Sequence, residues 1–209
     1  AGALAAGPVY AAAGRSTEPS LAGQQIPLKI GIRAATLKMP GNLDAVRAAA
    51  SLPGIRGVEL QVTSGSPSLR DWDMVRRYKA EAHRWGISIP SLAGLWDKDV
   101  KIHTPGAADN LRASVRAAEL LGASVILAAF FRGDAPDMAR EDSYGPIVEM
   151  LGSVAGIAAD AGVVIGLENS LSPADNKKLI DLVAHPAVRV YYDLHNMESY
   201  GHTGQSVPG

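Results

Sequence analysis

Two carboxylates in the second half of the chain each end a predicted strand. Glu168 closes the otherwise apolar run VVIGLE, and Asp193 closes the run VRVYYD. Because neighbouring parallel strands lie about 4.8 Å apart, two carboxylates at equivalent heights can hold one divalent cation between them. Such a cation also removes the cost of unpaired charges at the end of buried strands. The spacing predicts a shared metal site; the alternative is that each carboxylate pairs with Arg or Lys or caps a helix.

Six short runs rich in apolar and β-branched residues supply the strands that would position these carboxylates. The predicted strands span residues 28–34, 57–62, 86–91, 124–131, 163–168 and 188–193. Helices are predicted over residues 42–52, capped by Asn42, over 111–121, ending at Gly122, and over 173–183, where Ser172 is the cap and Pro173 the first residue. Strands that alternate with helices in this way are typical of β/α units around a parallel sheet.

The distribution of polar residues favours one of the two architectures built from such units. A doubly wound sheet that binds a dinucleotide has a glycine-rich turn after its first strand, and residues 34–38 (AATLK) have none. A TIM barrel places functional side chains at the carboxyl ends of many strands. The chain carries such residues in every predicted strand or in the loop that follows it: Lys38, Glu59, Gln61, Trp96, His103, Arg132, Glu168, Asn169, Asp193, His195 and Asn196. We therefore predict a TIM (β/α)8 barrel.

The number of units indicates that only part of this barrel is present. A closed barrel needs eight units and about 250 residues, whereas the sequence ends directly after the sixth unit, at Gly209. We expect residues 28–209 to form a partial barrel domain that lacks the last two β/α units. A natural six-unit protein is the less favoured alternative, because its first and last strands would leave open edges.

Composition narrows the class of partner. The 209 residues carry a formal net charge of -1 and are 47% hydrophobic, with no clustered basic excess of the kind that nucleic-acid binding requires. A small-molecule partner is predicted, and nucleic acid is not. The chain has no cysteine, so a metal site must use oxygen and nitrogen ligands. Nothing in the sequence indicates the oligomeric state.

The first 27 residues differ from the rest in composition. Residues 1–14 are nearly all small and apolar and contain Ala11-Ala12-Ala13, which resembles a signal-peptidase cleavage region, and residues 15–27 are polar with Pro and Gly. We predict the remnant of an export signal followed by a linker, and hence an exported, periplasmic protein; a flexible leader on a cytoplasmic protein is the alternative. The stretch is too short to span a membrane stably.

Several short runs resemble one family in both type and order. These are GVEL around Glu59, GLEN around Glu168, and YYDLHN around Asp193 followed by Gly201-His202. Together they resemble the sugar phosphate isomerase/epimerase family of xylose isomerase-like TIM barrels, from Leu28 to the end. The resemblance implies that Glu168 and Asp193 bind a divalent metal, Mn²⁺, Co²⁺, Mg²⁺ or Zn²⁺. It also implies a histidine and an acidic ligand from strands seven and eight, beyond Gly209, so we expect the 209 residues alone to be inactive.

The resemblance further implies a reaction and a set of substrate contacts. The expected enzyme is a sugar isomerase or epimerase that transfers a proton next to a carbonyl through a metal-stabilised enediolate, with Glu168 as both ligand and base. Expected contacts to the sugar or sugar derivative come from Glu59, Trp96, His103, Asn196 and His202. Glu59 can instead pair with a cation such as Lys38, Trp96 can pack beneath a loop, and His103 can be a solvated loop residue.

Three other functions are alternatives to this expectation. Endonuclease IV shares the barrel but has an Asp-x-x-His motif on strand six, where this chain has Asn196 three residues after Asp193. A lyase or hydratase on an oxidised sugar such as a 3-keto-glycoside would use the same metal and enolisation. A noncatalytic sugar-binding barrel would retain the fold without needing a metal. Because no phosphate cradle is visible and export is predicted, a non-phosphorylated substrate is favoured.

Overall fold

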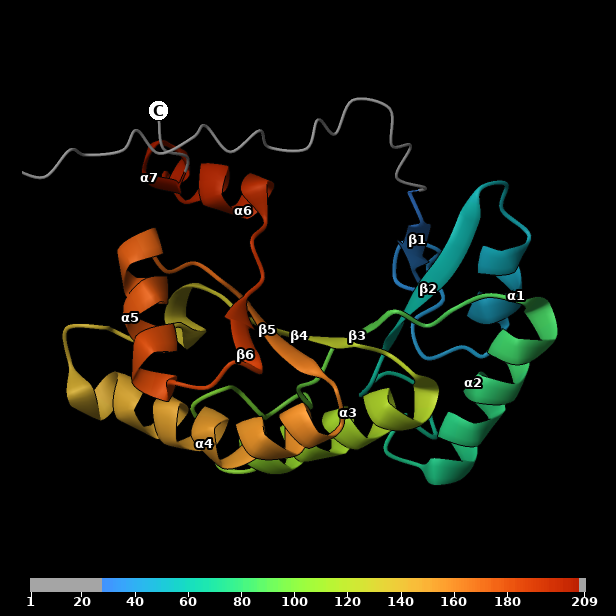
Figure 1. Ribbon diagram of the computed structural model, residues 1–209, viewed down its shortest axis with the longest axis horizontal. Coiled ribbons are helices and arrows are strands. Elements are labelled where there is room, and N and C mark those ends of the chain that lie inside the picture. Colours follow the sequence, from blue (N-terminus) through green and yellow to red (C-terminus); the bar gives the residue numbers. More distant parts are fainter. Residues whose placement is uncertain (1–27, 207–209) are drawn as a thin grey trace, which may run out of the picture.

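Six parallel strands form one sheet in which the strands follow their order in the sequence. The computed structural model describes residues 28–206, and the predicted leader and linker at 1–27 lie outside them. The strands are β1 (Ile30–Arg33), β2 (Ile55–Gln61), β3 (Ser91–Ala93), β4 (Val125–Phe130), β5 (Val164–Asn169) and β6 (Val188–Val190). Each strand pairs only with its neighbours in sequence, which leaves β1 and β6 at the two edges of a partial barrel (Figure 1).

Helices connect the strands and cover the outer side of the curved sheet. They are α1 (Asp44–Ala50), α2 (Trp72–Trp85), α3 (Ala107–Leu121), α4 (Glu141–Asp160) and α5 (Pro173–Val183). The short helices α6 (Leu194–Ser199) and α7 (Thr203–Ser206) follow β6 and lie beyond its carboxyl end (Figure 1). Within residues 28–206, no helix is both long and apolar enough to cross a membrane.

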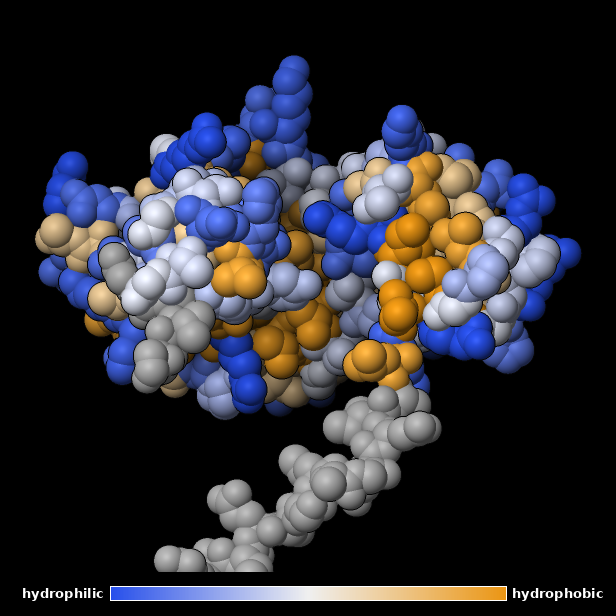
Figure 2. Space-filling model, turned by 90° about the horizontal axis from the view of Figure 1, so that it is seen from above, coloured by the Kyte–Doolittle hydropathy of each residue, from blue (hydrophilic) through white to orange (hydrophobic). Residues whose placement is uncertain are grey.

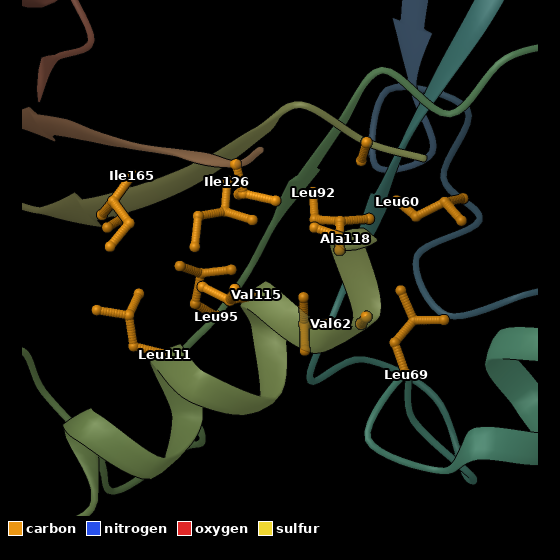
Figure 3. Packing of buried hydrophobic residues seen from close by; sticks show 14 of the residues in the cluster. Leu60, Val62, Leu69, Leu92, Leu95, Leu111, Val115, Ala118, Ile126 and Ile165 are labelled. Atoms are coloured by element: carbon orange, nitrogen blue, oxygen red, sulfur yellow. The ribbon is translucent and has the colours of Figure 1, made fainter. Parts of the chain in front are cut away.

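The core lies between the sheet and these helices. Side chains from the outer face of the strands, such as Leu60, Leu92, Ile126 and Ile165, meet the inner face of α3 at residues such as Val115 (Figure 3). All five are no more than 2% exposed. Residues that alternate with them along the strands face the inside of the barrel, where the candidate site lies.

The helix signals read from the sequence are present in the structure. The Ser172 hydroxyl oxygen accepts a hydrogen bond from the Asp175 backbone N–H at 3.1 Å, and Pro173 begins α5. Gly122 ends α3 in the left-handed conformation, with φ 77°. One start was predicted too early, because α1 begins at Asp44; Asn42 instead accepts the Asp44 backbone N–H at 2.9 Å.

The predicted third strand is shifted towards the C-terminus. The sequence indicated residues 86–91, whereas β3 spans Ser91–Ala93. Gly86 still belongs to the end of α2, where it adopts φ 61°, and only Ser88 of the following residues forms a bridge, to Gly57. Pro90 has no N–H to donate to a ladder, so regular pairing with β4 begins after it.

Candidate metal and substrate site

The parallel register brings the functional strand ends to one end of the barrel. Arg33 on β1 lies opposite Glu59 on β2, and Ala129 on β4 lies opposite Glu168 on β5. Figure 2 looks down on the molecule from above in Figure 1 and shows hydrophobic surface between more hydrophilic flanks. Because the strands are parallel, Arg33, Glu59 and Glu168 lie at the same end of the sheet.

Glu59 is buried and held by two neighbours. Its carboxylate lies 2.7 Å from Arg33 Nε, at Oε1, and accepts a hydrogen bond from the Ser91 hydroxyl at 2.9 Å, at Oε2. Only 8% of Glu59 is exposed, whereas the Arg33 side chain is 52% exposed. The cation that pairs with Glu59 is thus Arg33 and not Lys38, and Arg33 presents its guanidinium to the barrel mouth.

Glu168 is half-buried at the end of β5 and surrounded by charges. Burial raises its pKa, and the charges of Asp193 and Glu59 raise the pKa further, while Arg33 opposes them. Asn196 Nδ2 donates a hydrogen bond to Glu168 Oε1 at 2.6 Å, which favours the ionised form. Glu168 is therefore a carboxylate with increased proton affinity whose orientation is set by an amide.

Asp193 is close to Glu168 but does not end a strand as predicted. β6 stops at Val190, and Asp193 is the N-cap of α6, where its Oδ1 accepts the Asn196 backbone N–H at 2.9 Å. Backbone pairing ends early because Asp193 satisfies the first turn of a helix instead of extending the ladder. Asn196 thus contacts both carboxylates, through its backbone to Asp193 and through its side chain to Glu168.

Glu168 and Asp193 have the chemistry of oxygen ligands for a divalent metal ion. The proton affinity of Glu168 is raised by Asp193, which is the electrostatic condition that a bound cation relieves. Among residues 28–206, no group of three or more His, Asp or Glu side chains is arranged to hold a metal. The metal site expected at Glu168 and Asp193 therefore stays a prediction.

Tyr191 completes the inner surface between the first and last strands. It lines a cavity of about 230 Å³ together with Arg33 and Glu59. Burial raises the pKa of Tyr191, and the charges of Glu59 and Glu168 raise the pKa further. The ring fits because residue 166 is glycine: a Cβ there would lie 3.1 Å from Tyr191 Cδ2. Tyr191 therefore lies close to both carboxylates across the barrel.

Sequence reasoning did not identify Arg33 or Tyr191. Each could have been noticed in the sequence, since Arg33 directly follows the apolar residues IGI and Tyr191 directly follows the last strand. Their importance comes from facing Glu59 and Glu168 across the barrel. Spacing along the chain does not reveal that arrangement, because Arg33 and Tyr191 are far in sequence from the carboxylates they face.

Trp96 and His103, both expected near the substrate, line two different cavities, and neither Glu168 nor Asp193 lines either of them. Trp96 donates a hydrogen bond from Nε1 to the Ala129 carbonyl oxygen at 2.8 Å and lines a cavity of about 270 Å³. His103 is exposed and lines a neighbouring cavity of about 250 Å³. Asp134 borders both cavities, so the two are adjacent.

The remaining strand-end residues differ in where they lie. Asn169 is 2% exposed and exchanges hydrogen bonds with Asn176 of α5 at 2.9 and 3.1 Å, so it anchors a helix and does not face the mouth. Lys38, Arg132 and His195 are exposed, and Gln61 is half-buried. His202 lies just after α6, and its backbone N–H donates to the Met197 carbonyl oxygen at 2.7 Å.

Solved structures of low sequence identity share this fold. A 3-keto-D-glucoside 4-epimerase from E. coli has a TM-score of 0.66 at 16% identity, covering 82% of this chain and 70% of that one. A D-psicose 3-epimerase with D-tagatose from Clostridium cellulolyticum H10 has a TM-score of 0.66 at 20% identity, covering 82% and 65%. A xylose isomerase-like TIM barrel protein from Mycobacterium smegmatis in complex with magnesium has a TM-score of 0.62 at 15% identity, covering 81% and 65%.

These likenesses define the class of fold, a xylose isomerase-like barrel of which the chain spans 65 to 70% of the length of the three proteins. A family model gives the assignment itself. The model described as the xylose isomerase-like TIM barrel matches residues 46–207, and the chain therefore belongs to that family. The family resemblance predicted from the sequence is confirmed. No curated protein sequence matches the chain.

Proposed function

We propose that the protein is a metal-dependent sugar isomerase or epimerase that moves a proton on a carbon next to a carbonyl. The observation that carries this proposal is Glu168, a half-buried carboxylate with a raised pKa, beside Asp193 at the carboxyl end of the barrel. A carboxylate of increased basicity accepts a proton from carbon more readily than an ordinary one. The two epimerases of the same fold support a reaction of this kind.

The proposed metal would be held by Glu168 and Asp193. A bound divalent cation would polarise the sugar oxygens next to the reacting carbon. Carboxylate oxygens suit Mg²⁺ or Mn²⁺, and added imidazole ligands would extend the choice to Co²⁺ or Zn²⁺. The magnesium complex of the Mycobacterium smegmatis protein supports a divalent metal.

The surrounding residues of this chain would orient the substrate and the base. Asn196 fixes Glu168 through the bond from Nδ2 to Oε1 and caps its own helix against Asp193. Glu59 would act on the substrate through Arg33, whose guanidinium it anchors. Trp96 would provide an apolar wall for the sugar. Direct contacts from His103 and His202 to the substrate complete the proposal.

The test is isotope exchange catalysed by the full-length protein. The Glu168→Gln variant, incubated with ketohexoses or 3-keto-glucosides in D₂O with Mn²⁺, should incorporate deuterium next to the carbonyl about 10²–10⁴-fold more slowly than the unaltered protein. The control is Glu149→Gln, which alters an exposed carboxylate on α4 and should exchange at the normal rate. An unchanged rate of deuterium incorporation in Glu168→Gln would contradict the proposal.

Two alternatives predict different results in the same experiment. A lyase or hydratase acting on a 3-keto-glycoside would begin with the same proton removal but release the group on the neighbouring carbon, so the product would be unsaturated or hydrated and not an epimer. A noncatalytic sugar-binding protein would show no exchange and would bind sugar equally well after chelation of metal.

We also propose that the protein is exported. The small apolar residues of the first 14 positions and the AAA run within them support this proposal. Fractionation of cells that express the full-length protein should place it in the periplasm. Recovery in the cytoplasmic fraction alone, with an unprocessed N-terminus, would contradict export.

A further inference from the structure

A cavity at the carboxyl ends of β3 and β4 has aromatic side chains in its wall. It has a volume of about 270 Å³ and lies between the loop after β3 and the end of β4. Trp96 and Phe131 line it, and the Phe131 ring stacks on Tyr200, with centroids 6.3 Å apart. Small-molecule sites usually enclose roughly 300–1,000 Å³, so this volume suits a single ring better than a longer chain.

The lining of the cavity includes the residue that is paired with the proposed base. The Trp96 indole N–H is bonded to the carbonyl oxygen of Ala129, which also lines the cavity. Ala129 is the residue directly opposite Glu168 in the pairing of β4 with β5. Since paired strands lie about 4.8 Å apart, a ligand in this cavity is a near neighbour of one at Glu168.

The polar groups of the cavity are balanced in charge. Lys101 Nζ and Asp134 Oδ2 form an ion pair of 2.8 Å at its rim, and Asp97, which also lines it, pairs with Arg70 at 2.6 Å. No lining cation is left to attract an anion. Donors and acceptors beside aromatic faces suit a neutral ring with hydroxyl groups, because such a ring offers both C–H faces and hydrogen-bonding edges.

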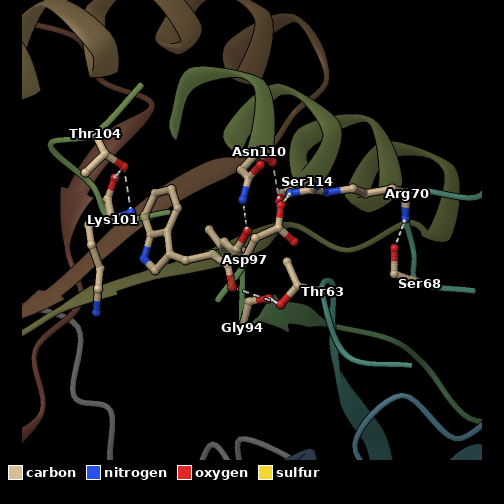
Figure 4. Close-up of polar contacts among 11 residues, drawn as sticks. Thr63, Ser68, Arg70, Gly94, Asp97, Lys101, Thr104, Asn110 and Ser114 are labelled. Atoms are coloured by element: carbon tan, nitrogen blue, oxygen red, sulfur yellow. Dashed lines mark hydrogen bonds and ion pairs between the residues drawn. The ribbon is translucent and has the colours of Figure 1, made fainter. Parts of the chain in front are cut away.

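The loop that carries Trp96 is held firmly in place. Thr63 Oγ1 donates to the carbonyl oxygens of Gly94 at 2.8 Å and of Trp96 at 3.1 Å, and Asn110 Nδ2 donates to that of Leu95 at 3.0 Å (Figure 4). The wall of the cavity is therefore built before any ligand arrives, which reduces the entropic cost of binding.

We propose that this cavity, defined by Trp96, Phe131, Lys101 and Asp134, is a second sugar subsite, so that the substrate is a glycoside whose second ring lies there. The proposal rests on the proposed function, because it takes Glu168 as the place of the reacting ring. It assigns the substrate class as neutral disaccharides or aryl glycosides.

The test compares one-ring and two-ring ligands by calorimetry on the full-length protein with Mn²⁺. The pairs are methyl β-D-glucoside with cellobiose, and methyl α-D-glucoside with maltose. In at least one pair the disaccharide should bind about tenfold more tightly. Trp96→Ala should abolish this advantage, so that the disaccharide binds no more tightly than the methyl glucoside. Trp85→Ala, which alters a tryptophan 41% exposed at the end of α2, should preserve it.

A second variant covers the case in which Trp96→Ala does not fold. Phe131→Leu keeps an apolar side chain but removes the ring, and it should also reduce the disaccharide advantage severalfold. The second subsite is refuted if the disaccharides bind no better than the methyl glucosides. It is also refuted if both variants weaken one-ring and two-ring ligands by the same factor. The proposed function stands in either case. If no ligand binds and isotope exchange is also absent, both proposals fail.

Discussion

The side-chain amide of Asn196 acts directly on the pKa of Glu168, because it donates a hydrogen bond to the carboxylate oxygen Oε1. This bond lowers a pKa that burial and Asp193 raise. Replacing Asn196 with Leu should therefore raise the pKa of Glu168 further. The acidic limb of the pH profile of kcat/KM should move to higher pH, since the base must be ionised to act. An unmoved limb, with only a uniform loss of rate, would show that Asn196 acts on substrate and not on Glu168.

Glu168 should also make the protein less stable at neutral pH in the absence of metal. A carboxyl whose pKa is higher in the folded protein than in the unfolded chain binds protons more tightly when folded, so stability falls as pH rises through that interval. In EDTA, Glu168→Gln should raise the thermal unfolding midpoint at pH 7.5, by about 2–4 °C for each kcal/mol regained. At a pH below both pKa values this gain should vanish; an equal gain at acid pH would assign it to packing.

For single residues, the sequence revealed polar side chains that stand next to apolar neighbours. Glu168 and Asp193 stood out because each follows an apolar run, and the structure places them together. Asn169 stood out for the same reason, yet it faces α5, because side chains alternate along a strand and only every second one points inward. Tyr191 did not stand out, since a tyrosine near a strand is ordinarily part of the core.

Strand β5 depends on a glycine for its fit against the residues after β6. At Gly166 a Cβ would lie 3.1 Å from Tyr191 Cδ2 and 3.3 Å from its Cβ. Gly166→Ala should displace the ring and destabilise the protein by roughly 1–3 kcal/mol, as overpacking does. The matched control is Gly156→Ala on α4, where an added Cβ would meet no neighbouring atom within 4 Å. This change should stabilise the helix by about 0.5–1 kcal/mol. Urea unfolding measures both; equal effects would contradict the packing account.

The elements predicted best are those with local chemical signals. The start of α5 at Pro173 follows from Ser172, and the end of α3 follows from Gly122. β3 was displaced because the run GISIPS has the composition of a strand, while Pro90 and the turn at Gly86 postpone the pairing. The end of β6 was missed because Asp193 has two possible roles, strand end or helix cap, and neighbours outside the local sequence decide between them.

For the molecule as a whole, metal binding should couple β5 to α6. A ligand present at 100 times its dissociation constant stabilises the folded state by about 2.7 kcal/mol. Added Mn²⁺ should therefore raise the thermal unfolding midpoint of the full-length protein, and EDTA should reverse the rise. Asp193→Asn retains a side chain able to cap α6 but removes the charge that opposes ionisation of Glu168. Its midpoint without metal should therefore be no lower than that of the unaltered protein, and its response to metal should be lost. An undiminished response would exclude Asp193 as a ligand.

The sequential order of the sheet has a consequence for synthesis on the ribosome. Because each strand pairs only with the strands before and after it in the chain, every β/α unit can dock as soon as it emerges, without waiting for a distant partner. The candidate site forms later than most of the sheet. Glu168 and Asp193 meet only once β6 has joined the sheet, so nascent chains should acquire their scaffold first and their metal affinity late.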